Sequence, residues 1–272
     1  MHTIVEKSVI IAAHPDDEVL WFSSIVDRVD RVVVCFLDYE PEPHWGPGRR
    51  RSLLSHPVRN ISSLGLKEAG VFDTADWREP TLTEFGIEIP DRSISKRYSD
   101  NYHSLKQLLS ESVRACCNVV THNPWGEYGH EEHVQVYRVV KELQSEMGFN
   151  LWFSNYCSNR SFRLMLRYVS GFDAPYITLR TNKDIAMQAK ELYKENGCWT
   201  WFDDWEWFNE ESFMPQRDHV GVLRPHGRIF PINMIKFRYS EAEHRRERPV
   251  LGIRGLRMLK GRIRRRMAMR ST

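Results

Sequence analysis

Long apolar runs are absent from this sequence of 272 residues. The apolar run near the amino terminus, VIIAA at residues 9–13, is short, and acidic residues follow it closely. It is too short for the hydrophobic region of a signal peptide, and no later segment approaches the roughly 18 to 20 apolar residues of a membrane span. We therefore expect no signal peptide and no transmembrane helix, and we predict a cytoplasmic protein.

Cysteine is scarce as well, with five in the chain and no pair in a CxxC arrangement. An odd number without such spacing argues against a disulfide scaffold and fits a reducing compartment. The hydrophobic and charged fractions, 41% and 28%, are ordinary for a globular protein and exclude a disordered or collagenous chain. The length is sufficient to bury a substantial core.

The net charge of +3 conceals an uneven distribution of charge along the chain. Residues 241–272 contain eleven Lys and Arg against three acidic residues, whereas the rest of the chain has 28 basic and 33 acidic residues. A nucleic-acid-binding protein would instead spread basic charge over a folded face. We therefore expect no nucleic-acid partner.

The basic tail at 241–272 has the pattern of an amphipathic helix. Apolar residues recur every three or four positions among its arginines, at Ile253, Leu256, Leu259, Ile263 and Met267. On a helix they would form one apolar stripe opposite a cationic face. Such a helix could lie on an anionic membrane at its inner face, or it could dock on the domain with its arginines solvated.

Runs of strand length alternate with helical patterns in the first part of the chain. We predict strands at 7–13, 31–37, 115–121 and 151–156, and helices at 18–29, 50–64, 102–114 and 130–147. The strands are nearly continuous apolar runs, as in a parallel sheet with both faces buried. The alternation predicts an α/β fold, with a mostly parallel sheet and helices on both faces.

Further along the chain the pattern is less regular. A strand is expected at 176–179 and a helix at 183–196, with Asn182 as its N-cap and Gly197 just beyond its end. No repeat and no low-complexity linker is present. We therefore predict a single domain over 1–240, with a C-terminal elaboration, followed by the basic tail.

Two polar motifs follow predicted strands. The first is AHPDDE at residues 13–18, and the second is THNPWGEYGHEEH at 121–133. In open α/β sheets, binding sites lie just outside the carboxyl ends of the strands, so both motifs should open at one edge. His130 and His133, three residues apart at the start of a helix, share one face of it.

A metal site is one interpretation of these motifs. One His and one Asp from the first motif, with one His from the second, make three ligands and leave a fourth position for water, as in catalytic zinc sites. Alternatively, Asp16 and Asp17 cap the following helix, and the two histidines lie on a helix surface. The occurrence of both motifs at strand ends favours the metal site.

AHPDDE, followed about a hundred residues later by GHEEH, resembles the PIG-L/LmbE-like deacetylase family. The resemblance is clear over about residues 5–156, is looser at 180–210 and is absent from the basic tail. It implies a Rossmann-like fold and a zinc-dependent hydrolase that removes N-acetyl groups from amino sugars in glycan biosynthesis. The motifs do not identify the substrate, which could be lipid-linked, nucleotide-linked or a free glycoside.

Carried over by motif position, the resemblance implies roles for five residues. His14, Asp17 and His133 match the family's metal ligands, for one zinc ion per chain. Asp16 matches its general base. His130 matches the histidine that assists the oxyanion or protonates the leaving amine.

The chain departs from the family pattern in two places. Many members have a Pro-Asp pair between the two histidines of the second motif, where this chain has Glu131 and Glu132. An arginine-rich helix follows the second strand in many members, but Arg49, Arg50 and Arg51 lie in a different register here. No substrate contact is assigned to these arginines.

The chemistry implied for these residues is amide hydrolysis. Zinc lowers the pKa of bound water towards about 7 and polarises the acetyl carbonyl. Asp16 would accept the proton of the water and deliver it to the amine, while His130 would stabilise the oxyanion. The products would be acetate and a free amino sugar. Iron(II), cobalt or manganese could also occupy a His₂Asp set, with availability helping to decide.

Aromatic residues are candidates for the wall of a sugar cleft. Four tryptophans lie within nine residues at 199–207, and sugars present apolar faces that stack on aromatic rings. In the alternative interpretation, this cluster packs a C-terminal layer onto the sheet. The residues expected to contact substrate are Trp125, Glu127, Tyr128, Trp199 and Trp201.

Two other functions are weighed against the zinc-dependent deacetylase. One is a metal-dependent deacylase of a non-sugar amide, such as one with a different acyl chain or a small thiol conjugate. The other is a non-catalytic, membrane-associated binding protein on the same fold that uses the basic tail. The presence of a base beside the ligands argues against the second, because a binding module has no need of one.

Overall fold

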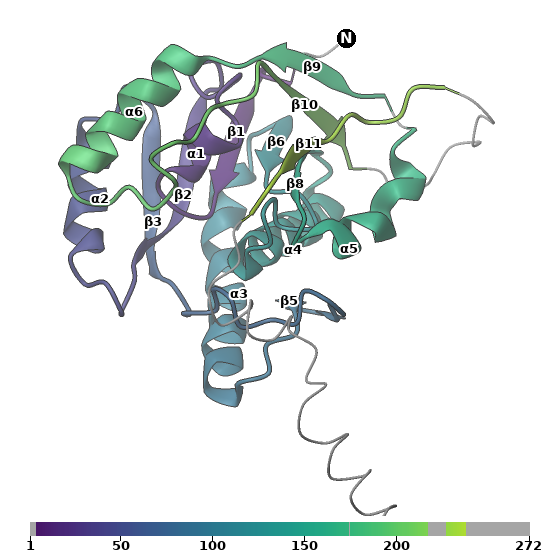
Figure 1. Ribbon diagram of the computed structural model, residues 1–272, viewed down its shortest axis with the longest axis horizontal. Helices are drawn as coiled ribbons and strands as arrows, with labels where there is room; N and C mark the ends of the chain where they lie inside the picture. Colours follow the sequence, from purple (N-terminus) through teal and green to yellow (C-terminus); the bar gives the residue numbers. More distant parts are fainter. Residues whose placement is uncertain (1–3, 174, 217–226, 238–272) are drawn as a thin grey trace, which may run out of the picture. The chain divides into compact units, whose positions relative to one another are not determined.

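The computed structural model describes residues 4–173, 175–216 and 227–237, and a seven-stranded sheet forms its centre (Figure 1). The strand order is β3-β2-β1-β6-β7-β10-β9. The strands are β1 (Ser8–Ala12), β2 (Arg31–Asp38), β3 (Ile61–Lys67), β6 (Asn118–Thr121), β7 (Asn150–Ser154), β9 (Ile177–Arg180) and β10 (Glu210–Pro215). The strands from β3 to β7 pair in parallel, whereas β10 pairs antiparallel with β7 and β9. The predicted mostly parallel α/β sheet is confirmed.

Helices cover both faces of the sheet. They are α1 (Asp17–Leu20), α2 (Trp45–Leu54), α3 (Arg92–Val113), α4 (Glu131–Met147) and α6 (Lys183–Glu195). α3 and α4 pack against each other, and α4 also contacts β1, β6 and β7. α1 and α2 contact α6 instead, with α1 against β1 and α2 against β2. Because parallel crossovers are right-handed, the strands on either side of β1 carry their helices on opposite faces.

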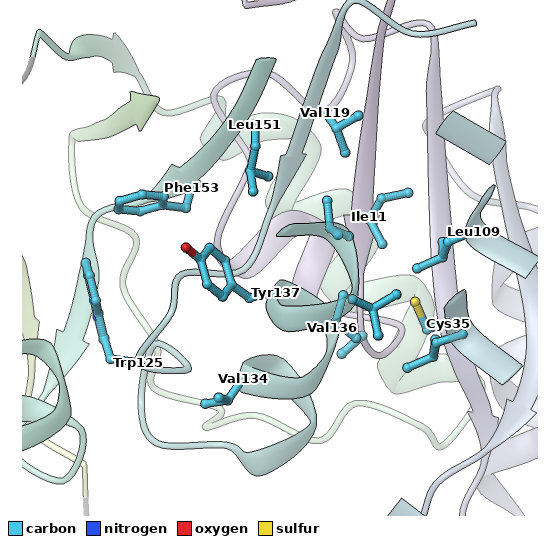
Figure 2. Close-up of a cluster of buried hydrophobic side chains, with 14 of the residues drawn as sticks. Ile11, Cys35, Leu109, Val119, Trp125, Val134, Val136, Tyr137, Leu151 and Phe153 are labelled. Carbon is cyan, nitrogen blue, oxygen red and sulfur yellow. The ribbon is translucent and has the colours of Figure 1, made fainter. Parts of the chain in front are cut away.

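The main apolar cluster lies between the sheet and the layer formed by α3 and α4. Ile11 of β1, Val119 of β6 and Leu151 of β7 lie beside Val136 and Tyr137 of α4 (Figure 2). Every residue of β1 is buried, since alternate side chains face the two helical layers. The strands that end at the two polar motifs are therefore held from both sides.

Shorter elements complete the described chain. They are β4 (Leu82–Thr83), β5 (Gly86–Ile87), β8 (Tyr156–Ser158), α5 (Phe162–Met165), the 3-10 helix η1 (Leu166–Gly171) and β11 (Asn233–Ile235). β4 and β5 form an antiparallel pair, and β8 and β11 form a parallel pair. The antiparallel strands β9 and β10, with α6 between them, extend the sheet at one edge. The strand expected at 176–179 and the helix expected at 183–196 are β9 and α6, whereas β10 was not predicted.

The ends of two helices follow signals in the sequence. The side chain of Asn182 accepts a hydrogen bond from the backbone N–H of Ile185 at 3.3 Å, and Gly197 beyond α6 has φ 67°, both as predicted. The side chain of Asp91 accepts hydrogen bonds from two backbone N–H groups in the first turn of α3. With this cap, α3 begins at Arg92, ten residues before the start of the helix predicted at 102–114.

The helix predicted at 18–29 is wrong beyond its first turn, because α1 ends at Leu20. The apolar residues that follow are buried as the pattern required, but they lie in turns. The buried carboxylate of Glu211 accepts hydrogen bonds from the Ser23 hydroxyl at 2.7 Å and from the backbone N–H of Ser24 at 2.9 Å. These bonds compete with helical ones, and no local pattern reveals a partner 187 residues away.

The helix predicted at 50–64 is wrong in its second half. α2 ends at Leu54, Pro57 follows, and β3 begins at Ile61. β3 is an edge strand of the sheet and is only partly buried. It therefore lacks the apolar run that identifies the central strands.

The chain divides into two units, Met1–Lys236 and Phe237–Thr272, and every element described above belongs to the first. None of the helices in the described part of the chain has the length and apolar character needed to cross a membrane. The basic tail at 241–272 lies outside the described residues. Its helix, its membrane contact, the boundary at residue 240 and the cytoplasmic location stay predictions.

Candidate active site

The two polar motifs meet at the carboxyl edge of β1 and β6, which are neighbours in the sheet. The first motif lies between β1 and α1, and the second lies between β6 and α4. The five residues with implied roles are 5% exposed or less: His14, Asp16, Asp17, His130 and His133. The structure therefore brings the predicted residues together, in the interior of the domain.

Asp17 lies at the centre of the candidate metal ligands. Its Oδ2 atom is 3.2 Å from Nδ1 of His14 and 3.2 Å from Nε2 of His133. The three donor atoms lie within 4.8 Å of one another. Nε2 of His133 is buried and has no hydrogen-bond partner among the described residues, which is rare for a buried nitrogen. A divalent cation between the three donors would satisfy it.

Two buried carboxylates hold the other nitrogen of each histidine. Oε2 of Glu132 lies 2.9 Å from Nε2 of His14, and Oε2 of Glu127 lies 2.8 Å from Nδ1 of His133. Since a carboxylate only accepts, these hydrogen bonds assign the ring proton to the nitrogen that faces it. The remaining nitrogen of each ring faces Asp17, and its lone pair becomes available to a cation when the ring is neutral. Metal-binding histidines usually have such a carboxylate or carbonyl partner.

His122 belongs to the same cluster, although the sequence analysis assigns it no role. Its ring stacks on that of His133 with centroids 3.8 Å apart, and its Nδ1 lies 3.0 Å from Oε2 of Glu127. Its Nε2 accepts a hydrogen bond from the backbone N–H of Ala13 at 2.8 Å. His122 therefore ties the end of β6 to the end of β1. Its position directly after the β6 strand is the signal that could have revealed it.

Two further sets of donors overlap with the first. They are His14 with His130 and Glu132, and His122 with Glu127 and His133. In the set with His130, Nδ1 of His130 accepts a hydrogen bond from a backbone N–H. In the set with His122, Nε2 of His122 accepts a hydrogen bond from a backbone N–H, and its Nδ1 faces Glu127. His133 belongs to the set with His122 as well, but there its Nδ1 faces Glu127, whereas its unpartnered Nε2 faces Asp17. We therefore favour the set with Asp17 for a cation.

Electrostatic interactions also favour a cation in this cluster. Burial lowers the pKa of His133, but the carboxylates of Asp17 and Glu127 outweigh burial and raise that pKa to about 9. For Asp17, burial raises the pKa, whereas His133 and two further histidines outweigh it and hold the pKa well below its ordinary value. A proton on His133 therefore balances the Asp17 carboxylate when no metal is bound. A divalent cation would bind by displacing such protons.

Asp16 has a strained backbone, with φ 106°. Residues other than glycine rarely adopt such angles, and this strain clusters at functional sites. Its side chain caps no backbone N–H of α1, so the alternative role as a helix cap does not apply to it. Its Oδ2 accepts a hydrogen bond from the Thr200 hydroxyl at 2.5 Å.

The pKa of Asp16 depends on what lies beside it. Burial and the neighbouring Asp17 carboxylate raise it to about 8, against the hydrogen bond from Thr200, which lowers it. A cation close to Asp16 would lower this pKa and favour the charged carboxylate. Metal binding would thus put Asp16 in the state that a general base requires.

His130 is the N-cap of α4, and its Nδ1 accepts a hydrogen bond from the backbone N–H of Glu132 at 3.1 Å. The proton of the neutral ring is therefore on Nε2. Burial, with the neighbouring His14 and His133, holds its pKa well below 6.5. His130 can thus act as a neutral imidazole that donates Nε2–H to a developing negative charge.

Two of the predicted substrate residues lie beside these catalytic candidates. The ring centroids of Tyr128 and Trp201 are 4.6 Å apart, and that of Tyr128 is 5.7 Å from that of His130. Trp201 is half-buried, and the adjacent Thr200 is exposed although its hydroxyl reaches Asp16. The segment that follows α6 therefore contacts the catalytic candidates and places two aromatic rings beside them.

The other three predicted substrate residues lie in different surroundings. Trp125 and Glu127 are fully buried, and the Trp125 ring nitrogen donates to a backbone carbonyl of β8 at 2.7 Å. Trp199 is half-buried, with the Lys190 amine 5.6 Å from its ring centroid. Trp207 donates to a backbone carbonyl of α1 at 2.7 Å, so it packs this segment onto the domain. Trp201 therefore remains a candidate for the sugar cleft, whereas Trp207 has the packing role that was the alternative interpretation.

Arg49 also reaches the site, although no contact was assigned to it. Its Nη1 donates to Oε1 of Glu68 at 2.6 Å and to a backbone carbonyl of β2 at 3.1 Å. Oε2 of Glu68 lies 4.0 Å from Nε2 of His14. Arg50 and Arg51 make exposed contacts elsewhere. Burial against Glu68 distinguishes Arg49 from Arg50 and Arg51, and a pattern of neighbouring residues cannot predict it.

Trp21 holds the second oxygen of Asp17. Its Nε1 donates to Oδ1 of Asp17 at 2.8 Å, so Oδ2 alone faces the histidines. The indole is fully buried, with its centroid 5.1 Å from Tyr156 and 5.3 Å from Trp201. This packing fixes the indole and, through it, the rotamer of the carboxylate.

Replacing Trp21 with phenylalanine is expected to weaken metal binding about 10- to 100-fold, the usual effect of losing a group that orients a ligand. The ring is kept, but Oδ1 of Asp17 loses its donor. The measurement is competition for zinc or cobalt against a chelator of known affinity. Trp205→Phe is the matched control, because Trp205 packs 6.1 Å from Trp21 in the same cluster. Equal affinities in Trp21→Phe and the unaltered protein would exclude this role.

Comparison with curated proteins gives two deacetylases. No family model matches the chain. Two curated relatives are 1D-myo-inositol 2-acetamido-2-deoxy-alpha-D-glucopyranoside deacetylases. That of Corynebacterium diphtheriae is 24% identical over 159 residues, which is 52% of this chain and 53% of the relative. That of Corynebacterium kroppenstedtii is 25% identical over 158 residues, 50% of this chain and 40% of the relative. The chain thus spans about half the length of the curated relatives it matches.

Solved structures with a detectable likeness include two deacetylases. One is a deacetylase–teicoplanin complex from the biosynthesis pathway of teicoplanin, at 16% identity and a TM-score of 0.46, covering 78% of this chain and 99% of that chain. The other is the antimicrobial reagent A40926 pseudoaglycone deacetylase, at 13% identity and a TM-score of 0.45, covering 76% of this chain and 96% of that chain.

Proposed function

We propose that this chain is a metal-dependent hydrolase that removes the N-acetyl group from an amino-sugar conjugate of the N-acetylglucosamine type. The observation that carries the proposal is the buried set of Asp17 and two histidines, with Asp16 and His130 beside it, at the carboxyl edge of the sheet. The similarity to two deacetylases of an acetamido sugar supports the substrate class.

His14, Asp17 and His133 would hold the cation. Two imidazoles and a carboxylate suit zinc, and iron(II), cobalt and manganese accept the same donors. When bound, the cation supplies Lewis acidity that polarises the acetyl carbonyl and lowers the pKa of a water molecule. Glu127 and Glu132 would orient the two histidine rings. We therefore assign Glu127 a positioning role in place of the predicted substrate contact.

Asp16 acts as the general base in this proposal. It takes a proton from the attacking water, whose oxygen forms a bond to the acetyl carbon. When the carbon–nitrogen bond breaks, the protonated Asp16 returns that proton to the leaving amine, so the products are acetate and a free amine. The Thr200 hydroxyl holds the carboxylate in one position for both transfers.

His130 stabilises the charge that develops on the acetyl oxygen. Its Nε2–H is the available donor, because Nδ1 is occupied by a backbone N–H. Its low pKa keeps the ring neutral throughout, so it acts as a hydrogen-bond donor and leaves proton delivery to Asp16. Loss of one such donor typically costs about 10²- to 10³-fold in rate.

Tyr128 and Trp201 would form the wall against which the sugar lies. Aromatic rings offer an apolar face to the C–H groups of a pyranose. The Tyr128 ring lies beside that of His130 and packs against the Trp201 ring, whereas Trp125 is fully buried. Trp201 belongs to the segment without helix or strand between α6 and β10, so displacement of that segment would open the site to a sugar.

The proposal can be tested by measuring acetate release from a panel of N-acetyl amides that differ only in the amine. We expect hydrolysis of N-acetylglucosaminides at rates at least ten times those of N-acetyl amino acids or N-acetyl thiol conjugates. Such a preference follows if the aromatic wall binds a pyranose. Turnover of the non-sugar amides alone would refute the amino-sugar assignment while leaving a metal-dependent deacylase.

A further inference from the structure

We propose that Phe72 is a positioning residue for His130, and that it fixes the imidazole in the plane from which Nε2–H is donated. The two rings stack with centroids 5.0 Å apart and an angle of 29° between their planes. Phe72 lies in the loop between β3 and β4, far in the sequence from the second motif. The inference rests on the proposed function, in which His130 stabilises the charge on the acetyl oxygen.

The hydrogen bond that His130 accepts does not by itself fix the plane of its ring. Nδ1 accepts from the backbone N–H of Glu132 at 3.1 Å, but the torsion that turns an imidazole about its bond to Cβ is broad. Nε2–H points outward in the plane of the ring, and a hydrogen bond weakens steeply when it departs from a straight line. The direction in which His130 donates therefore depends on what packs against the faces of its ring.

Rings with other assigned roles also lie beside His130. The His133 ring stacks on it with centroids 4.8 Å apart, the His14 ring is tilted at 4.7 Å, and the Tyr128 ring meets it edge-on at 5.7 Å. The first two belong to the candidate metal ligands, and the third belongs to the wall proposed for the sugar. A phenyl ring offers neither a metal ligand nor a hydrogen bond, so what Phe72 contributes is a flat packing surface.

A tight turn presents Phe72 to His130. The backbone N–H of Thr74 donates to the carbonyl of Val71 at 3.0 Å, which makes Phe72 the second residue of a four-residue turn. The third residue, Asp73, has φ 64°, in the left-handed region that few residues other than glycine adopt. Val71 is fully buried, so the turn is anchored in the core. Such backbone strain clusters at functional sites.

Glu131 ties this loop to the start of α4. Its Oε1 accepts hydrogen bonds from the backbone N–H of Ala75 at 3.0 Å and from the ring N–H of Trp77 at 3.1 Å. The carboxylate is fully buried, where such bonds are stronger than in water. Because Glu131 directly follows His130 in the chain, the histidine and the loop that stacks on it are anchored to each other.

Two further contacts hold the loop on either side of Phe72. Ahead of it, Oε1 of Glu132 accepts a hydrogen bond from the backbone N–H of Ala69 at 2.7 Å. Behind it, the buried guanidinium of Arg160 lies 3.1 Å from the carboxylate of Asp73 and 5.4 Å from the centroid of the Phe72 ring. A guanidinium over an aromatic face is attracted to it. The Phe72 ring is therefore held in place by contacts other than the one with the catalytic histidine.

Phe72→Leu is expected to lower kcat for an N-acetylglucosaminide about 10-fold with KM unchanged, because a misdirected donor fails in the transition state. Phe72→Tyr keeps the stacking ring and should retain the kcat of the unaltered protein. Phe162→Leu is the matched control, since Phe162 on α5 is 40% exposed against 41% for Phe72. A rise in KM at unchanged kcat would make Phe72 a substrate contact and overturn the positioning role, as would an unchanged kcat and KM.

A double-mutant cycle separates positioning from a general effect on the fold. In a His130→Ala background, Phe72→Leu should change kcat by less than about 2-fold, because the donor that Phe72 orients is gone. Thermal transitions of all the variants would be measured on the same samples. An equal loss of kcat in both backgrounds would show that Phe72 acts independently of His130, and it would refute the inference.

The stacking can also be measured without hydrolysis, by NMR of the full chain labelled with ¹³C-histidine. A phenyl ring stacked on His130 shifts the imidazole C–H resonances upfield, and His130→Ala identifies those signals. Phe72→Leu should move them downfield, whereas Phe72→Tyr should leave them in place. Unchanged resonances in Phe72→Leu would overturn the inference. If the unaltered chain hydrolysed no N-acetyl sugar, the proposed function would fail instead, and the spectra would still decide whether Phe72 fixes the ring.

Discussion

Asp16→Asn is expected to lower the rate of acetyl hydrolysis about 10²- to 10⁴-fold while the metal remains bound, since that range is typical of a lost general acid or base. Asparagine keeps the size of the side chain and can still contact the Thr200 hydroxyl. It cannot accept the proton of the attacking water. The metal ligands are unchanged, so metal content and thermal stability should match those of the unaltered protein.

The control for this variant is Asp100→Asn on the exposed side of α3, where Asp100 pairs with Lys96. It removes a carboxylate that has no part in the site, and its rate should equal that of the unaltered protein. Initial rates of acetate release, with metal content measured on the same samples, make the comparison. If Asp16→Asn retained full activity with metal bound, Asp16 could not be the base.

His133→Gln is expected to abolish detectable hydrolysis through loss of the metal. Loss of a supporting partner already weakens metal binding about 10- to 100-fold, and loss of a ligand should exceed that. Glutamine fills most of the volume of the ring, which limits the cavity that His133→Ala would leave in a fully buried position. Added zinc should restore little activity to His133→Gln, whereas it should restore the activity of the unaltered protein after treatment with a chelator.

His103→Gln provides the comparison for this second variant. His103 is exposed on α3 and packs beside Phe85, so its replacement should affect neither metal content nor rate. Circular dichroism and the thermal transition of each variant would separate local loss of metal from unfolding. If His133→Gln were active and a chelator abolished that activity, the metal would have to be bound by another set of donors.

The position of the catalytic candidates follows from short-range information. Buried apolar runs identify β1 and β6, and the carboxyl ends of adjacent parallel strands must meet at one edge. The first and second motifs therefore come together without any knowledge of the packing. The capping of α6 by Asn182 is predictable for the same reason, since its partner is the Ile185 backbone three residues away.

The supporting residues could not be predicted, because their partners are distant in the sequence. Thr200 bonds Asp16 across 184 positions, and Glu211 bonds Ser24 across 187. Trp21 is close to Asp17, but an indole in an apolar pattern indicates core packing, and its hydrogen bond appears only in three dimensions. Such long-range partners also explain why the helix expected at 18–29 gives way to turns after Leu20.

Charge patterns along the chain have the same limitation. Three adjacent arginines at 49–51 are equivalent in the sequence, yet only Arg49 is buried against Glu68. Arg50 pairs instead with the exposed carboxylate of Asp38, and Arg51 contacts Asn196. The partner of each arginine lies at a distant position in the sequence, and the fold determines which one it meets.

The metal content of the purified protein, measured beside that of His133→Gln, tests the central claim most directly. We predict one divalent cation per chain in the unaltered protein and none in the variant, because Nε2 of His133 completes the donor set with His14 and Asp17. Absence of bound metal from both proteins after zinc is supplied would contradict the claim. So would equal metal content in the two.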